Sequence, residues 1–364
     1  MAIAKDNGIS MDAFDYEEVL SSLVGLSVNN EFKEVYLMRR VYSDEIASVV
    51  KRIASVRKEN SLIFPMFSDL HVDGTNTPEA ENLLNALSVI SDALNPSAVI
   101  DLGDNLSMLG RKHYISNQQL AEILTNLFDA VHNAADCPLF LVNGNHDAVG
   151  TDFFKPTLWN QIVRGKYDRA MAHPHNSGSY YYVDYEQSEL RMVFLSVPHE
   201  SDLTSEHPTP LWAFGAEQLN WLENEALNTN YNVLLFSHVP FFYRYRGDTT
   251  KIYEVWDGEK TATTRVDALC GWIDDAQQAA NIIAQRGNVI ACFSGHTHED
   301  SLWEPYQQRG EDVNYLPCRQ VVTTHAAHYP SDVGVAIDIL VWNPDEKQVH
   351  LIRFGEGADR RIVK

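Results

Sequence analysis

The chain has 364 residues, of which 45% are hydrophobic and 21% charged; these proportions are those of an ordinary folded protein and exclude wholesale disorder. Its 28 basic and 50 acidic residues give a formal net charge of −22, which counts against a broad binding face for an extended nucleic acid. No apolar run approaches the ~20 residues that a membrane helix needs, and Met1–Ser10 lacks the pattern of a secretory signal. We therefore expect a cytoplasmic protein with no membrane partner, in keeping with four cysteines that form no C-x-x-C pair.

Residues 1–60 are predicted to form a helical N-terminal extension. Ser43–Glu45 are expected to cap a helix whose apolar residues between 46 and 56 recur at helical spacing. We expect this extension to pack on the main domain, with attachment to another component as the alternative. No linker or internal repeat follows, so residues 61–364 are predicted to form one domain.

From residue 61 onward, short apolar runs alternate with amphipathic helices, which favours an α/β fold with ligands at the carboxyl ends of strands. The expected strands are Leu62–Phe67, Ala98–Leu102, Leu139–Val142, Met192–Leu195, Val233–Phe236, Val289–Phe293, Val333–Val341 and Gln348–Phe354. The expected helices lie at residues 80–94, 117–133, 215–227 and 274–286.

Five polar clusters directly follow these apolar runs: Asp69-Leu70-His71, Gly103-Asp104-Asn105, Gly144-Asn145-His146-Asp147, Ser237-His238 and Gly295-His296-Thr297-His298. Loops at strand ends are where a rigid scaffold holds functional groups. Side chains two residues apart on an extended segment share a face, so we expect Asp69 and His71 to point at one centre, and likewise His296 and His298.

The residue types in these clusters indicate a metal site. Carboxylate, amide oxygen and imidazole together suit divalent ions such as Mn, Fe, Ni or Zn, whereas the lack of thiolates argues against structural zinc. A single ion with all these ligands would be over-coordinated. Two ions that share one carboxylate would not be.

The ordered set D-x-H, G-D-N, G-N-H-D, S-H and G-H-T-H resembles the calcineurin-like metallophosphoesterase superfamily, over about residues 61–355. The G-D-N and G-N-H-D forms and the segment Glu217–Leu222 are similar to the cyclic-nucleotide phosphodiesterase and purple-acid-phosphatase-like branches. The resemblance implies a four-layer α/β/β/α sandwich of two mixed sheets flanked by helices, with a catalytic domain at residues 61–364.

The resemblance also implies a hydrolase with two metal ions, in which a hydroxide that bridges the metals attacks the substrate. The substrate would be a small phosphate diester or monoester, and nucleotides are among the candidates. The resemblance implies seven metal ligands: Asp69, His71 and His298 for one ion, Asn145, His238 and His296 for a second, and Asp104 bridging both. His146 would donate to a phosphate oxygen or protonate the leaving alkoxide. Some members carry His, Asp or Tyr three residues after the bridging Asp, where this chain has Ser107, so the partner that orients His146 is not identified.

Two other functions stay open: a nuclease of the same superfamily, which the acidity disfavours, and a structural or binding component that retains the metal site. Residues 111–114 follow the loop of Asp104, and residues 241–246 follow that of His238. Their arginine and aromatic side chains would suit a substrate whose phosphate carries a ring; the alternative is that both segments are solvated surface loops. His325 and His328 follow a strand-like run, and we expect packing or surface roles for them, with an approach to the metals as the alternative. We expect Asp73 and Asp147 to cap turns or support the ligands.

Overall fold

The computed structural model describes residues 30–107, 116–147, 167, 172–175, 179–197, 213–241, 273, 275–298, 300–303, 306–307, 315–326, 334–355 and 357–363. The chain forms two compact units, Met1–Asp44 and Glu45–Lys364. Helix α3 (Asn30–Val56) supplies the described part of the first unit and continues into the second. The predicted cap at Ser43–Glu45 is wrong, because no Gly or Pro interrupts the helix from Asn30 onward. The division of domains at residue 60 stays a prediction.

Within the described residues, the strands form two mixed sheets beside a short β10–β11 pair (Tyr306–Gln307 and Tyr315–Leu316). The first sheet has six strands, in the order β15 (Arg360–Val363), β14 (Gln348–Gly355), β13 (Ala336–Asn343), β1 (Leu62–Phe67), β2 (Val99–Asp101) and β3 (Leu139–Leu141). Its strands β1, β2 and β3 run parallel to one another, and β13 runs antiparallel to β1.

The second sheet has seven strands among the described residues, in the order β4 (Ala172–Pro174), β5 (Tyr181–Tyr185), β6 (Leu190–Phe194), β7 (Asn232–Phe236), β8 (Val289–Ser294), β12 (Arg319–Val322) and β9 (Ser301–Trp303). The strands β6, β7, β8 and β12 are parallel, so their carboxyl ends lie at one edge of the sheet.

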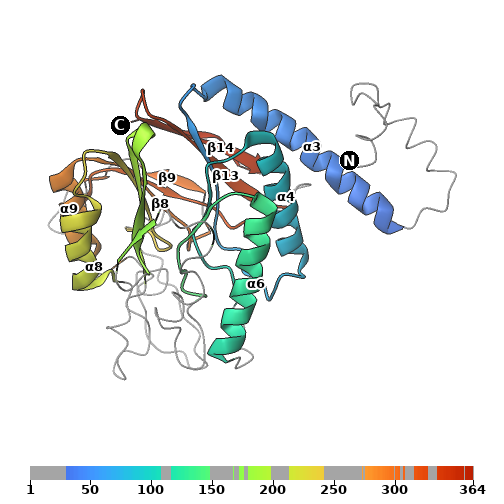
Figure 1. Ribbon diagram of the computed structural model, residues 1–364, viewed down its shortest axis with the longest axis horizontal. Helices are drawn as coiled ribbons and strands as arrows, with labels where there is room; N and C mark the ends of the chain where they lie inside the picture. The colour runs from blue at the N-terminus through green and yellow to red at the C-terminus, as the bar shows by residue number, and fades with distance from the viewer. Residues whose placement is uncertain are drawn as a thin grey trace, which may run out of the picture. The chain divides into compact units, whose positions relative to one another are not determined.

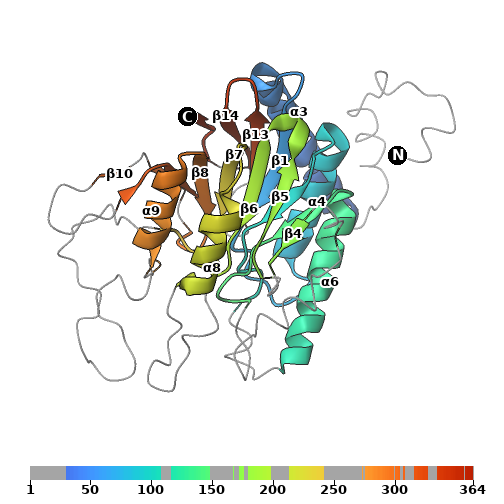
Figure 2. The ribbon, with the colours of Figure 1, turned by 60° about the vertical axis from the view of Figure 1, so that its left-hand side comes forward.

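Helices cover the outer faces of the sheets (Figure 1 and Figure 2). Helices α4 (Pro78–Leu94) and α6 (Asn117–Ala135) flank the first sheet. Helix α8 (Gly215–Trp221), which continues as a π-helical turn η5 (Leu222–Ala226), and helix α9 (Ala276–Arg286) flank the second. The expected α/β fold of two mixed sheets flanked by helices is confirmed. None of the described helices is long and apolar enough to cross a membrane.

The core between the sheets is an aromatic stack. The rings of Phe194 and Phe236 lie 4.9 Å apart, and those of Phe236 and Phe293 lie 5.2 Å apart. Phe140 brings the first sheet to this stack, at 5.5 Å from Phe194. All four side chains are fully buried, and each contributes about 1.5–3 kcal/mol by leaving water. This packing fixes the two sheets face to face and holds their loop edges in register.

Helix α4 shows how the sequence sets an element boundary. The Thr77 side chain accepts a hydrogen bond from the Ala80 amide at 3.3 Å, and Pro78 occupies the first turn, where its missing N–H costs nothing. The apolar residues Leu83 and Leu87 are buried one turn apart. The helix ends at Asn95, whose φ of 48° is left-handed.

Candidate metal centre

Loops at the carboxyl ends of five parallel strands carry every residue of the predicted site. The loops after β1, β2 and β3 belong to the first sheet, and those after β7 and β8 belong to the second. Contacts join the two sets: the His296 amide donates to Asp69 Oδ2 at 2.9 Å, and His238 Nδ1 lies 2.9 Å from the carbonyl oxygen of Leu102. The structure therefore brings all eight predicted residues to one place, between the edges of the two sheets.

The backbone of these loops adopts an uncommon conformation. Ten described non-glycine residues have positive φ, and five of them are predicted ligands: Asp69, His71, Asp104, His296 and His298. This corrects the reason for their convergence, since the pairs two residues apart are not extended. Their side chains point at one centre because left-handed residues turn the chain back on itself. Such a backbone costs a non-glycine residue about 1–2 kcal/mol, which the surrounding bonds must offset.

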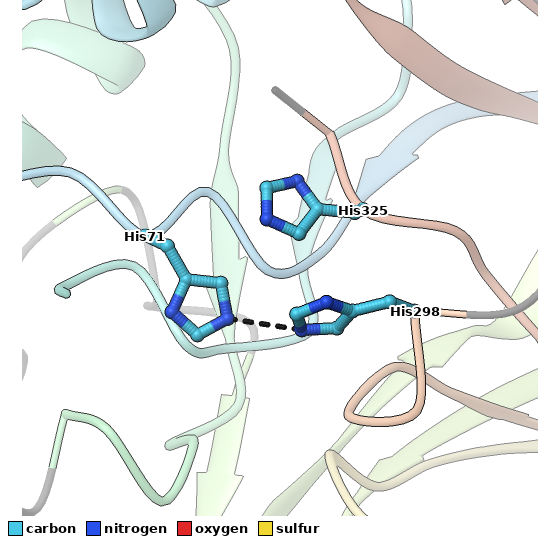
Figure 3. Close-up of side chains that lie close together, drawn as sticks. All are labelled: His71, His298 and His325. Atoms are coloured by element: carbon cyan, nitrogen blue, oxygen red, sulfur yellow. Dashed lines mark hydrogen bonds between the residues drawn. The ribbon is translucent and has the colours of Figure 1, made fainter. Parts of the chain in front are cut away.

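The first group of candidate ligands consists of Asp69, His71 and His298. His298 Nε2 lies 3.2 Å from Asp69 Oδ1. It lies 3.1 Å from His71 Nε2, the contact that Figure 3 marks with a dashed line. His71 Nε2 lies 3.7 Å from Asp69 Oδ1. Asp69 is fully buried, whereas the His298 side chain is 41% exposed, so the group opens to solvent on the side of His298.

The second group consists of Asn145, His238 and His296, with the carboxylate of Asp104. Asn145 Oδ1 lies 3.0 Å from His238 Nε2 and 2.9 Å from His296 Nδ1. Asp104 Oδ2 lies 3.1 Å from His238 Nε2 and 3.9 Å from His71 Nε2 of the first group. One carboxylate therefore faces both groups, as a bridging ligand must.

These donor atoms fit two metal ions. Adjacent ligands at about 2.0–2.2 Å from one ion, at right angles, lie about 3 Å from each other. The shortest contacts within each group, 3.1 Å between His71 and His298 and 2.9 Å between Asn145 and His296, match this spacing. Imidazole with carboxylate and amide oxygen suits Mn, Fe, Zn or Ni, and among the described residues no thiolate joins these groups.

The two buried carboxylates stay charged in spite of their burial. Burial alone would raise the pKa of Asp69, but hydrogen bonds from His298 and His71 hold it well below its ordinary value of 3.8. Burial acts in the same direction on Asp104, and there the charge of His238 lowers the pKa. Both groups are therefore anionic near neutral pH and ready to bind cations.

The histidines of the second group differ in their protonation. Burial would lower the pKa of His238, but Asp104 and then Asp69 raise it to about 9. Burial, and next the charge of His238, lowers the pKa of His296 to about 4. A bound cation must therefore displace a proton from His238, whereas His296 already offers its lone pair.

His146 lies at the border of the two groups. Its side chain is 21% exposed, its Nε2 lies 3.9 Å from Asp104 Oδ2, and its ring meets that of His71 edge-on at 4.4 Å. Burial lowers its pKa below 6.5 and His71 adds to this, against the opposing charge of Asp104. Its buried Nδ1 has no hydrogen-bond partner among the described residues.

Asp147 holds two of the loops together. Its Oδ2 accepts from the amides of Asp104 at 3.0 Å and Gly144 at 3.1 Å. Its Oδ1 accepts from those of Asn105 at 2.9 Å and Leu106 at 3.2 Å. The carboxylate therefore supports the ligands and belongs to none of the groups that face a metal. Ser107, at the position where some family members carry a partner for this histidine, donates its hydroxyl hydrogen bond to Asp73 and not to His146.

One residue beside the site was not among the predicted ligands. The structure places His325, 6% exposed, against the rings of His71 and His298, so a surface role is wrong, and its packing brings it beside the predicted ligands, as the alternative expectation had it. The sequence signal for this approach is its place after the strand-like run of β12. The segments 111–114 and 242–246, and His328, lie outside the described residues.

Residues 66–300, more than half of the chain, match the family described as calcineurin-like phosphoesterase. The chain belongs to this family. Calcineurin-like phosphoesterases use dinuclear metal centres, and the membership makes this chain a metal-dependent phosphoester hydrolase. The resemblance read from the motifs is thus confirmed.

Solved structures agree on the fold. A dimetal phosphatase from zebrafish (Danio rerio) aligns at 13% identity with a TM-score of 0.53, over 83% of this chain and 98% of that one. A purple acid phosphatase from yellow lupin (Lupinus luteus) seeds aligns at 13% identity with a TM-score of 0.50, over 84% of this chain and 54% of that one. Among curated proteins, no match was found.

Proposed function

We propose that this calcineurin-like phosphoesterase hydrolyses a small phosphorylated molecule, a diester or a monoester, with nucleotides among the candidate substrates. The observation that carries the proposal is the carboxylate of Asp104, which lies 3.1 Å from His238 of one ligand group and 3.9 Å from His71 of the other. Mn, Fe, Zn and Ni are the candidate ions. Asp69, His71 and His298 would hold one, Asn145, His238 and His296 the other, with Asp104 shared.

The residues around the ions have separate tasks in this proposal. Two bound ions would supply positive charge to the phosphate oxygens and acidify a water. His146 faces the same centre from its partly exposed position, so its N–H can donate to a phosphate oxygen or to the departing alkoxide. Its lowered pKa keeps the ring mainly neutral near pH 7, so the N–H that it offers is the hydrogen-bond donor of a neutral imidazole.

The charge of the chain supports a small substrate. A net charge of −22 repels a polyanion over its whole length, whereas one phosphate group meets only the local field of the centre. We propose no nucleic-acid or membrane partner. A cytoplasmic location is proposed because Cys292 and Cys318 are buried thiols whose sulfur atoms lie 3.5 Å apart without a disulfide, which fits a reducing compartment.

The test is hydrolysis of bis-p-nitrophenyl phosphate and p-nitrophenyl phosphate by the chelated full chain, before and after Mn²⁺ is restored. We expect activity only with metal, and a 10²- to 10⁴-fold loss of turnover, about the range for a proton donor, in His146→Ala with both ions still bound. The matched control is His173→Ala, an exposed histidine on β4. Full activity in His146→Ala would overturn its role.

Two other results would redirect the proposal. Hydrolysis of DNA in preference to the small esters, with a steep salt dependence, would favour the nuclease alternative. Two bound ions without turnover of any ester, under Mn, Fe, Zn or Ni, would favour the structural component.

A further inference from the structure

A sixth loop lies beside the five that carry the predicted ligands. It follows β12, which runs parallel to β8, so the two loops leave the same edge of the sheet. The Thr323 amide donates to the carbonyl oxygen of Ser294 at 2.7 Å, and the Ala326 amide donates to that of Ser68 at 2.9 Å. These bonds fix His325, between them in sequence, against the loops that follow β8 and β1.

The ring of His325 packs against two predicted ligands and is almost completely buried, at 6% exposure. It stacks on His71, with 5.2 Å between ring centroids and 28° between planes, and meets His298 edge-on at 4.5 Å. One ring nitrogen of each histidine lies within 4.8 Å of those of the other two. Figure 3 shows the three rings around a common space, each from a different loop.

A partly buried network of ion pairs holds this loop and the loop after β8 in place together. Asp338 accepts from Thr323 Oγ1 at 3.0 Å and pairs with Arg360 at 2.6 Å. Arg360 also pairs with Asp300, at 2.9 Å, just beyond the ligands of the β8 loop. Because the same guanidinium bonds to carboxylates behind both loops, the position of His325 relative to His298 is set by the fold.

Three imidazole nitrogens at this spacing could together bind one metal cation. A neutral imidazole has one donor and one acceptor nitrogen, and protonating all three rings would place like charges within 4.8 Å of one another. A divalent ion instead accepts a lone pair from each ring. We infer that His325 is a further ligand of the ion held by Asp69, His71 and His298, an inference that rests on the proposed metal centre.

This assignment makes the two metal positions unequal. The position beside His325 would have three imidazoles and the carboxylates of Asp69 and Asp104, whereas the other would have two imidazoles, Asn145 and Asp104. More imidazole favours Fe, Ni or Zn over Mg or Ca at the first position. The ion beside His325 should therefore be the harder one to remove.

The test is calorimetric titration of the chelated full chain with Mn²⁺. The wild type and His173→Ala should show two sites. We expect His325→Ala to weaken one site by at least the 10- to 100-fold or so that loss of a ligand's hydrogen-bond partner causes, and to leave the other unchanged. His325→Gln, which keeps an oxygen donor of similar reach, should lie between them, and unfolding of the metal-free variants checks that each is folded.

Paired variants identify the affected site. His298→Ala combined with His325→Ala should keep one tight site, whereas Asn145→Ala combined with His325→Ala should keep none. Unchanged affinity at both sites in folded His325→Ala would overturn the inference and leave the proposed function standing. Equal loss of both ions in that variant would also overturn it, since His325 would then support the whole centre. A wild type that binds no Mn²⁺ would refute the metal centre itself.

Discussion

Replacing Asp147 by Asn tests the electrostatics of the loops that carry the ligands. Its carboxylate is buried and accepts four backbone amides, two at each oxygen. Asn keeps the shape but offers a single acceptor oxygen, so two of these amides would face an NH₂ group. Each unsatisfied buried donor costs about 1–3 kcal/mol, which gives a total of about 2–6 kcal/mol.

The substitution also removes a buried charge, and this effect has the opposite sign. Burial and the charge of Asp104 raise the pKa of Asp147 from 3.8 to about 6. A raised pKa means that the folded state holds the proton more tightly, so the stability is present below pH 3.8 and is lost as pH rises through 6. The shift of 6 − 3.8 units, at 1.36 kcal/mol per unit, amounts to about 3 kcal/mol. About half of this loss falls between pH 5 and pH 8.

The assay is urea unfolding of the chelated wild type and Asp147→Asn at pH 5, 6, 7 and 8. The two proteins share all other titrating groups, so the difference between their unfolding free energies isolates Asp147 to a first approximation. From pH 5 to pH 8 the unfolding free energy of the wild type should fall by about 1.5 kcal/mol relative to that of Asp147→Asn. A difference that stays constant over this range would refute the reasoning, whatever its size.

Three further predictions concern the same centre. Asp104→Ala should lose both bound metal and activity, measured by metal analysis and ester hydrolysis; a fully metallated, active variant would contradict the bridging role. Because the pKa of His238 is raised from 6.5 to about 9, the chelated protein should lose about 3 kcal/mol of unfolding free energy as pH rises from 6.5 through 9. The same proton should be released when Mn²⁺ binds, and calorimetry in buffers of different ionisation heat should detect it. Gly144→Ala should lower Mn²⁺ affinity, since the added methyl group would meet the backbone and carboxylate of Asp104; unchanged titration curves would count against this.

Much of the fold follows from the sequence because its strands are buried on both faces. The apolar runs Leu62–Phe67 and Val289–Phe293 are continuous, as strands inside a layered α/β fold require, and both form strands. Strand β5 (Tyr181–Tyr185) was not predicted, because Asp184 interrupts it and it forms no continuous apolar run; its buried residues Tyr181 and Val183 alternate with partly buried ones. The edge strand β15 (Arg360–Val363) was not predicted either, because its two arginines leave no apolar run.

The site was predictable where a motif places ligands at fixed spacing and not where it depends on packing. Asp69 and His71, or His296 and His298, stand two residues apart, so the pattern is visible in the sequence. His325 stands alone in its loop, and only the parallel pairing of β12 with β8 brings it to the other histidines. The left-handed backbone at the ligands was equally invisible, because no glycine marks it.

That backbone explains how loops can hold ligands as firmly as strands would. The amide of Asp69 donates to Gly103 at 2.8 Å and that of His71 to Asp104 at 3.0 Å, so the loops after β1 and β2 are bonded to each other. The His146 amide donates to Asp104 Oδ1 at 2.7 Å, which leaves Oδ2 to face His238. The amides of Asp104 and His296 donate to the carboxylates of Asp147 and Asp69, so four of the five left-handed ligands are held by a bond from their amide to a neighbouring loop. The strain is spread over several contacts, and the bridging carboxylate is aimed by the backbone before any ion binds.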